Sequence, residues 1–356
     1  MAGLYIHIPY CHSKCAYCDF YSGPFSNPTP EEYFAALRNE YATRRLAETG
    51  NEPFATIYVG GGTPSCVAPQ LLEPLLRHSR DDAEVTVEAN PDDVTDDWVR
   101  EIRGLGVNRV SMGVQSLVDK ELQAVGRRHS ADEALRAIDT LRHGGIENIS
   151  CDLIYGLPEQ DIESWQYSLN RLLAEGLPHL SAYLLSYEPG TRLYAALQAG
   201  KIVEASDDTV QQMYDLLCSQ AAACGMEHYE ISNFAMPGQQ SRHNSAYWNF
   251  TPYLGLGPGA HSFDGKTRRN NPSNIKRYVA KAGNVAEAEY LSDEERHNDI
   301  VITALRTSQG ISPDDLSPDE LKAAKRTLQL TSDGRYRIAE QQWLLSNMMM
   351  EPFIRV

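Results

Sequence analysis

Tyr5-Ile-His-Ile-Pro-Tyr-Cys11-His-Ser-Lys-Cys15-Ala-Tyr-Cys18-Asp-Phe20 contains three cysteines at CxxxCxxC spacing. The cysteines follow directly on a short β-like run, residues 4–8, which Pro9 ends. Thiolates bind soft iron or zinc, and such tight spacing lets one loop present three sulfurs to a single centre. The stretch therefore predicts a metal centre on a loop at the end of the first strand.

The identity of the fourth ligand separates two interpretations of this loop, because a tetrahedral metal or a cubane cluster normally has four. One interpretation is a zinc site completed by His7, His12 or Cys66. The other is a 4Fe-4S cluster held by the three cysteines alone, with one iron left open for a small molecule.

Composition and charge limit the class of protein. The chain has 356 residues, of which 42% are apolar and 9% aromatic, enough for one large α/β domain and a smaller one. A net charge of −16 argues against duplex nucleic acid as a partner, so an anionic substrate must be held by local cations. We see no secretion signal and no run of 18 apolar residues, so we expect a cytoplasmic protein without a membrane span. Seven cysteines are an odd number, and three lie too close in sequence for a disulfide framework.

Short β-branched runs alternate with amphipathic helical stretches up to about residue 235, which indicates repeated βα units around a parallel sheet. We expect strands at residues 4–8, 56–59, 84–88, 109–114, 148–154 and 180–186. We expect helices at residues 31–48, 131–142, 161–173 and 207–224. Spacing alone fits an incomplete barrel and equally an open doubly wound sheet.

The chain changes in character after residue 235. Residues 236–288 are rich in Asn, Gly, Pro, Tyr and Trp, which predicts a loop-rich segment. Residues 289–356 contain helical stretches at 293–305 and 318–328, a turn at Ser332-Asp-Gly334 and a strand-like run at 336–338. We therefore divide the chain into an α/β domain (1–235), a loop-rich segment (236–288) and a small helical or winged α+β domain (289–356).

Polar residues gather where the expected strands end, and in a parallel barrel that face carries the active site. They are Gly61, Gly62 and Thr63 at the second strand, Glu88 at the third, Gln115 at the fourth, Asp152 in the fifth and Ser186 at the sixth. The glycines let a polar ligand approach main-chain groups without interference from a Cβ atom. Taken singly, each residue is explained equally well as a satisfied polar group at a strand end.

A second group of candidate residues is Arg242-His243-Asn244-Ser245-Ala246-Tyr247-Trp248. Histidine is the commonest protein ligand of haem iron, and the two large aromatics that follow are suited to a flat porphyrin face. From spacing alone, however, His243 is more often a hydrogen-bonded loop histidine than a ligand.

A glycine-rich run, Gly255-Leu-Gly257-Pro-Gly259-Ala-His261, imitates a dinucleotide-binding loop. It contains proline and opens no clear helix, so we discount a Rossmann interpretation. The remaining cysteines and several histidines are interpreted as structural: Cys66, Cys151, Cys218, Cys224, His129, His179 and His228.

With its flanks, the cysteine stretch resembles the radical S-adenosylmethionine (SAM) superfamily. The resemblance implies an incomplete (β/α)6 barrel and a 4Fe-4S cluster at Cys11, Cys15 and Cys18 whose open iron is chelated by SAM. The context Tyr-x-His-Ile-Pro before Cys11 is similar to the oxygen-independent coproporphyrinogen oxidase group. The oxidases proper carry CxxxCxxCxC, whereas Phe20 stands at the fourth cysteine position here. That departure and the intact HNxxYW run resemble the HemW branch, the haem chaperones.

The resemblance also implies roles for matching residues. Gly61, Gly62 and Thr63 hold the amino group of SAM, and the other implied SAM-site residues are Tyr5, Tyr17, Glu88, Gln115, Arg127, Asp152 and Ser186. Glu88 and Asp152 suit ribose hydroxyls. Arg127 suits a carboxylate, although it equally fits an exposed helix cation beside Arg128. The implied haem-binding residues are His243, Asn244, Tyr247 and Trp248, and His261 is an open candidate for contact with SAM or haem.

The expected function is that of a haem chaperone, which binds haem and transfers it to an unidentified acceptor protein, with a homodimer as one expected form. The alternative is an oxygen-independent coproporphyrinogen III oxidase, which performs a radical SAM decarboxylation. Phe20, the HNxxYW run and the lack of an extension before the first strand argue against the oxidase. A purely structural zinc protein is the third class, and it leaves Glu88, Gln115 and the glycine run without a purpose.

Overall fold

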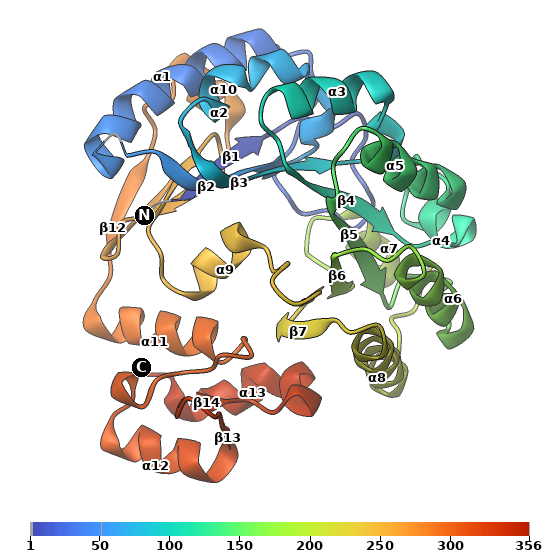
Figure 1. The fold of residues 1–356 in the computed structure, drawn as a ribbon, viewed down its shortest axis with the longest axis vertical. Coiled ribbons are helices and arrows are strands. Elements are labelled where there is room, and N and C mark those ends of the chain that lie inside the picture. The colour runs from blue at the N-terminus through green and yellow to red at the C-terminus, as the bar shows by residue number, and fades with distance from the viewer. Residues whose placement is uncertain (1–2, 51, 356) are drawn as a thin grey trace.

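The computed structural model describes residues 3–50 and 52–355, and its central feature is a curved twelve-stranded sheet (Figure 1). Six consecutive strands pair in parallel and in chain order: β1 (Gly3–Ile8), β2 (Phe54–Gly61), β3 (Ser79–Ala89), β4 (Arg109–Gln115), β5 (Asn148–Tyr155) and β6 (His179–Leu184). All six strands were predicted, and their sequential order with strong curvature distinguishes a partial barrel from a doubly wound sheet.

Helices cover the convex face of this sheet (Figure 1). They are α1 (Pro30–Thr49), α2 (Glu73–Leu76), α3 (Asp96–Gly104), α4 (Asp119–Ala124), α5 (Ala131–His143), α6 (Ile162–Leu173) and α8 (Asp207–Ala223). Helix α7 (Arg192–Gln198) instead packs against the cysteine loop, where the Leu193 N–H donates to the Ala16 carbonyl. Short 3-10 turns η1 (Pro64–Cys66), η2 (Pro69–Leu71) and η3 (Pro91–Asp93) lie in the connections. Thr29 with Glu32 and Ser130 with Glu133 form capping boxes that fix the starts of α1 and α5.

Alternation along the strands separates the core from the inside of the barrel. On β1, Leu4, Ile6 and Ile8 are fully buried in the core, so Tyr5 and His7 project to the concave side. On β2, Thr56 and Tyr58 likewise point inward, where they bond to His243 and Glu88. The apolar half of each strand therefore packs under the helices, and the polar half lines the interior.

The segment 236–288, which we expected to be loop-rich, instead extends the same sheet. It contains α9 (Arg242–Trp248), β9 (Tyr253–Leu256), β10 (His261–Phe263), β11 (Thr267–Asn270), α10 (Ile275–Ala280) and β12 (Glu287–Tyr290). Strand β9 pairs in parallel with β1, and β10 to β12 continue antiparallel. Because these strands are only three or four residues long, their glycines and prolines dominated the sequence pattern. Residue 235 is therefore no physical boundary.

The opposite edge of the sheet is closed by β8 (Asn233–Ala235), antiparallel to β6, and then by β7 (Glu227–Glu230). The short helix α9 lies on the concave side of the sheet, above α11 (Figure 1). In the described residues, 3–50 and 52–355, no helix is both long and apolar enough to cross a membrane.

The C-terminal segment packs below the open side of the sheet (Figure 1). It comprises α11 (Asp293–Ala304), η4 (Pro313–Asp315), α12 (Pro318–Thr327), β13 (Gln329–Leu330), β14 (Tyr336–Arg337), η5 (Glu340–Leu345), α13 (Ser346–Met350) and η6 (Glu351–Phe353). The two helices and the hairpin around Gly334 match the predicted helical and winged pattern.

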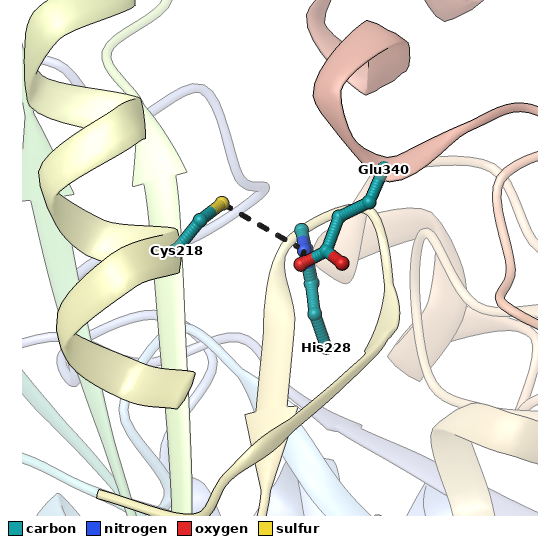
Figure 2. A group of neighbouring side chains, drawn as sticks. All are labelled: Cys218, His228 and Glu340. Atoms are coloured by element: carbon teal, nitrogen blue, oxygen red, sulfur yellow. Dashed lines mark hydrogen bonds and ion pairs between the residues drawn. The ribbon is translucent and has the colours of Figure 1, made fainter. Parts of the chain in front are cut away.

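One cluster of side chains ties this segment to the barrel. Figure 2 shows His228 of β7 between Cys218 of α8 and Glu340 of η5. His228 Nδ1 lies 3.0 Å from Glu340 Oε1 and 3.9 Å from Cys218 Sγ. The ring also stacks on Phe234 at 3.9 Å and meets the edge of Trp343 at 4.2 Å. The hydrogen bond from His228 lowers the pKa of Glu340, and this contact joins β7 to η5.

Candidate functional site

A cavity of about 390 Å³, which we call the barrel cavity, opens at the carboxyl ends of the parallel strands. The three cysteines and nine of the ten predicted SAM residues line it: Cys11, Cys15, Cys18, Tyr17, Gly61, Gly62, Thr63, Glu88, Gln115, Arg127, Asp152 and Ser186. These residues come from the loop after β1, from β2 to β6 and the segments that directly follow them, and, for Arg127, from the connection between α4 and α5. The structure thus brings together groups that are separated by up to about half the chain.

The spread of the three sulfurs distinguishes the two interpretations of the cysteine loop. Four ligands around one zinc ion hold their sulfurs ~3.8 Å apart, since each Zn–S bond is ~2.3 Å. Among the described residues, however, Cys11, Cys15 and Cys18 do not form a group of ligand atoms within 4.8 Å of one another. The one such group found there is Cys218, His228 and Glu340, at the other end of the sheet. The cysteine loop is therefore too open for one zinc ion and fits a larger centre.

The candidates for a fourth zinc ligand have other partners. His7 hydrogen-bonds through Nδ1 to the Tyr5 hydroxyl at 3.1 Å and through Nε2 to the Tyr21 carbonyl at 2.9 Å. Cys66 Sγ donates to the Thr63 carbonyl at 2.6 Å. His12 is 4.0 Å from Asp93 and half-exposed. None of the three completes a tetrahedral site with the loop cysteines.

The surroundings of the cysteines determine how readily they ionise. Burial raises the pKa of Cys11 and raises that of Cys18 to about 11, so both are thiols at neutral pH unless a cation replaces the proton. Arg127 Nη1 donates to Cys15 Sγ at 3.5 Å, and the Thr63 hydroxyl lies 3.1 Å from Cys11 Sγ. A multivalent metal centre would supply the charge that these three half-buried cysteines need to ionise.

The glycine run allows the cysteine loop and β2 to approach each other closely. A Cβ atom on Gly62 would lie 2.6 Å from the Tyr10 carbonyl oxygen and 3.1 Å from Cys11 Sγ. Gly61 has φ +116°, and a Cβ there would lie 2.7 Å from His7 Nδ1. Glycine is therefore required at both positions, where the chain passes between the loop and the cavity.

Two carboxylates lie in the wall of the barrel cavity. Glu88 accepts hydrogen bonds from the Tyr58 hydroxyl at 2.8 Å and from the Gly61 N–H at 3.1 Å. Burial raises the pKa of Glu88 to about 7 and that of Asp152 to about 6. Both lie at the cavity wall where the strand ends meet, and their role toward ligand hydroxyls stays a prediction.

Two arginines face the same cavity. Arg127 is held by Asn90 at 2.8 Å and the Gly113 carbonyl at 2.5 Å, while Arg128 forms the outer pair with Asp92. This arrangement excludes the alternative of Arg127 as an exposed helix cation. Arg109 is only 1% exposed, and its Nε and Nη1 atoms have no hydrogen-bond partner among the described residues. Sequence reasoning missed Arg109, although an arginine within a predicted buried strand was a usable signal.

Gln115 ends β4 in a left-handed conformation with φ +68°, next to an irregularity in the pairing of β4 with β5. Such a backbone is costly for a residue with a side chain and is concentrated at functional sites. Gln115 Nε2 lies 2.7 Å from the position of a Cβ on Gly113. A side chain at residue 113 would therefore collide with Gln115, which lines the cavity.

Tyr5 is the exception among the predicted SAM residues. Its hydroxyl bonds to His7, and its ring lines a second cavity of about 660 Å³, which we call the aromatic cavity. Asp19 and Phe20 line both cavities, so the loop after Cys18 is the wall between them.

The four predicted haem residues do not share one cavity. Asn244 lines the barrel cavity, Tyr247 lines the aromatic cavity, and Trp248 lines a third hollow on the other side of α9. His243 is only 1% exposed, and both ring nitrogens have partners, Thr56 Oγ1 and the Tyr247 hydroxyl, each at 2.9 Å. Burial lowers the pKa of His243 to about 3, so the ring is neutral. In this conformation His243 is the hydrogen-bonded histidine of the alternative interpretation and offers no nitrogen to a haem iron.

Replacing Glu88 with glutamine is expected to change the pH dependence of stability. The folded protein keeps the Glu88 proton up to about pH 7, whereas the ordinary pKa is 4.5, so the free energy of unfolding falls as pH rises through this window. The variant lacks that decline. The difference in free energy of unfolding, variant minus wild type, should therefore rise by up to about 3 kcal/mol from pH 5 to pH 8 in urea titrations. If the free energies of unfolding of the variant and the wild type change in parallel with pH, residue 88 is not a buried carboxyl that ionises in this range.

Comparison with known proteins gives the class first. Residues 5–172 match the family model described as the radical SAM superfamily. The solved structure of the coproporphyrinogen III oxidase HemN from Escherichia coli, titled a radical SAM enzyme, superposes with a TM-score of 0.82 over 99% of this chain and 89% of that one. At 23% identity, this match shows that the two folds are shared.

Closer relatives define the branch. The chain is 34% identical to the heme chaperone HemW of Bacillus subtilis over 99% of both chains. It is 38% identical to the heme chaperone HemW of Escherichia coli over 72% of this chain and 69% of the relative. A mouse protein, radical S-adenosyl methionine domain-containing protein 1, mitochondrial, is 39% identical over 73% of this chain and 60% of its own length. The chain belongs to the HemW family within the radical SAM superfamily.

Proposed function

We propose that this protein is a haem chaperone, which holds a 4Fe-4S cluster through Cys11, Cys15 and Cys18 and binds SAM beside it in the barrel cavity. The observation that carries the proposal is the barrel cavity itself, in which three widely spread sulfurs meet the predicted SAM residues. Family membership supports the haem-carrying role, since relatives over 30% identical are named heme chaperones.

Within the barrel cavity, each residue has a task that fits its chemistry. The main chain at Gly61 and Gly62 and the Thr63 hydroxyl would receive the amino group of SAM. Glu88 and Asp152 would accept hydrogen bonds from its ribose hydroxyls. Arg127, already close to Cys15, would hold its carboxylate at the side of the cavity nearest the cluster. The cluster supplies an open iron to which SAM can be chelated.

The unpartnered atoms of Arg109 support a polar occupant for this cavity. Leaving two guanidinium nitrogens buried without partners costs the protein free energy, of the order of 1–3 kcal/mol for each unsatisfied group. A bound carboxylate or hydroxyl group recovers that cost. A purely structural protein without a ligand would gain nothing from two unpartnered guanidinium nitrogens on Arg109.

The oxidase alternative shares the fold, and the superposition on HemN alone does not separate the two functions. Phe20 supports the chaperone, because it stands where the oxidase pattern has a fourth cysteine, and the residue is 64% exposed and lines both cavities. A phenylalanine there offers a stacking surface and no metal ligand or acid.

The test uses protein reconstituted with iron and sulfide without oxygen. Titration with ferric haem should give a saturable Soret band with one haem per chain, and haem-free myoglobin added afterwards should take up the haem. Incubation of the same preparation with dithionite, SAM and coproporphyrinogen III should leave the porphyrinogen unchanged. Conversion to protoporphyrinogen, without saturable haem binding, would establish the oxidase instead.

A further inference from the structure

The aromatic cavity is lined by residues from different predicted sets, Tyr5 and Tyr247, together with the open candidate His261. Its volume of about 660 Å³ lies within the ~300–1,000 Å³ of small-molecule sites. The side chains in its wall are largely aromatic: Phe20, Tyr21, Tyr247, Phe250, Tyr253 and Phe263. Rings of this kind pack on a flat, largely apolar macrocycle.

His261 of β10 offers an unpartnered imidazole in this wall. Its side chain is exposed, and among the described residues it makes no hydrogen bond or ion pair. Partial burial and the charge of Arg268 lower the pKa of His261, so the ring is neutral at pH 7 and has a nitrogen lone pair available.

The backbone of His261 is fixed by the glycine-rich run. A Cβ atom on Gly255 would lie 1.8 Å from the His261 carbonyl oxygen, so the β9 to β10 connection can form only with glycine there. Gly259 then turns the chain with φ +81°. The run that imitates a dinucleotide loop therefore serves to place His261 and Phe263 in the cavity wall.

The other histidines nearby are not available in the same way. His7 lines the same cavity, but its two nitrogens bond to Tyr5 and to the Tyr21 carbonyl. His243 is buried behind Tyr247, to which one of its nitrogens bonds. Of the three, His261 alone has both nitrogens uncommitted.

The remaining wall supplies a cation and a link to the cysteine loop. Arg268 Nη2 pairs with Asp299, and Arg268 Nε and Nη1 remain for an anionic group at the rim. Asp19 and Phe20 line both this cavity and the barrel cavity. A ligand here would therefore contact the loop that follows Cys18.

We infer that the aromatic cavity is the haem site, with His261 as the protein ligand of the haem iron and Arg268 as the partner of a haem propionate. The inference rests on the proposed haem-chaperone function and assigns its cargo to a place different from His243. The HNxxYW helix contributes Tyr247 to the wall, and His243 positions the Tyr247 hydroxyl from behind.

The test compares ferric haem with metal-free protoporphyrin IX on cluster-loaded protein. His261→Ala should weaken haem binding by about tenfold or more, because an axial imidazole is the main bond to the iron. It should leave the affinity for protoporphyrin IX nearly unchanged. Added imidazole should restore the wild-type Soret position in the variant. His143→Ala, on an exposed helix end far from the cavity, is the matched control and should bind both porphyrins as wild type does.

A second variant tests whether haem binds in the aromatic cavity, independently of the bond between His261 and the iron. Thr303→Trp, on α11 in the cavity wall, should block haem and protoporphyrin IX alike. If His261→Ala and Thr303→Trp both bind haem as wild type does, the haem lies elsewhere and the inference is wrong while the chaperone function stands. If wild-type protein binds neither porphyrin, the proposed function fails together with the inference.

Discussion

Replacing Cys18 with alanine is expected to remove most of the iron and sulfide from protein reconstituted without oxygen, from about four of each per chain to about one or fewer. Because the three sulfurs are not all within 4.8 Å of one another, we expect each cysteine to bind a different corner of the proposed cluster. No neighbouring thiol can replace Cys18, since Cys66 is committed to the Thr63 carbonyl. Chemical assays of iron and acid-labile sulfide, with the visible absorption of the brown cluster, measure the loss.

Cys66→Ala is the matched control for this variant. Cys66 lies close to the loop, and its thiol bonds only to main-chain carbonyls at Thr63 and Tyr10. The Cys66→Ala variant should keep the iron and sulfide content of the wild-type protein. A Cys18→Ala protein with unchanged iron, or a Cys66→Ala protein that has lost its iron, would contradict the assigned ligand set.

Gly62→Ala is expected to have the second largest effect. The added Cβ meets the Tyr10 carbonyl at 2.6 Å and the Ile8 carbonyl at 3.0 Å, and both are main-chain atoms that cannot rotate away. The clash pushes the cysteine loop off the end of β2, at a cost of about 1–3 kcal/mol, a usual range for overpacking. Cys11 Sγ lies 3.1 Å from the same Cβ, so the loop should also lose cluster occupancy. Urea unfolding and iron content report the two effects.

Gly23→Ala controls for a glycine replacement in the same region. Gly23 lies beside the cysteine loop, where its N–H bonds to the Pro9 carbonyl, but an added Cβ meets nothing within 4 Å. This variant should match wild type in stability and in iron. Equal losses of stability and iron in both variants would show that the region tolerates no substitution. The close approach of Gly62 to the Tyr10 carbonyl would then not be the cause of the Gly62→Ala effect.

Much of the barrel could be predicted from the sequence because its signals are local. Each parallel strand is a short β-branched run, and most of the longer helices between the strands begin at a capping residue, so β1 to β6 and the main helices fall close to the expected bounds. The residues at strand ends converge for the same reason, since parallel strands present their carboxyl ends on one face. Glu88 and Asp152 therefore lie in the barrel cavity, as predicted.

Features that depend on packing between distant segments could not be predicted. His243 was expected to be a haem ligand or a hydrogen-bonded loop histidine, but its partners could not be predicted: α9 lies inside the barrel and puts the ring against Thr56 and Tyr58. Tyr5 projects inward as expected, yet the extra strands β9 to β11 create a second cavity on its side. Strands of three or four residues give too weak a β pattern to be recognised among the glycines and prolines that separate them.

The most direct test of the account is electron paramagnetic resonance of the dithionite-reduced protein with and without SAM. A cluster held by three cysteines keeps one iron open beside the barrel cavity, so SAM should shift the g values of its S = 1/2 signal. Arg127→Met should weaken that response to SAM while leaving the signal itself in place. A spectrum that SAM does not change in the wild-type protein, or protein that carries zinc and no cluster signal, would contradict the central claim.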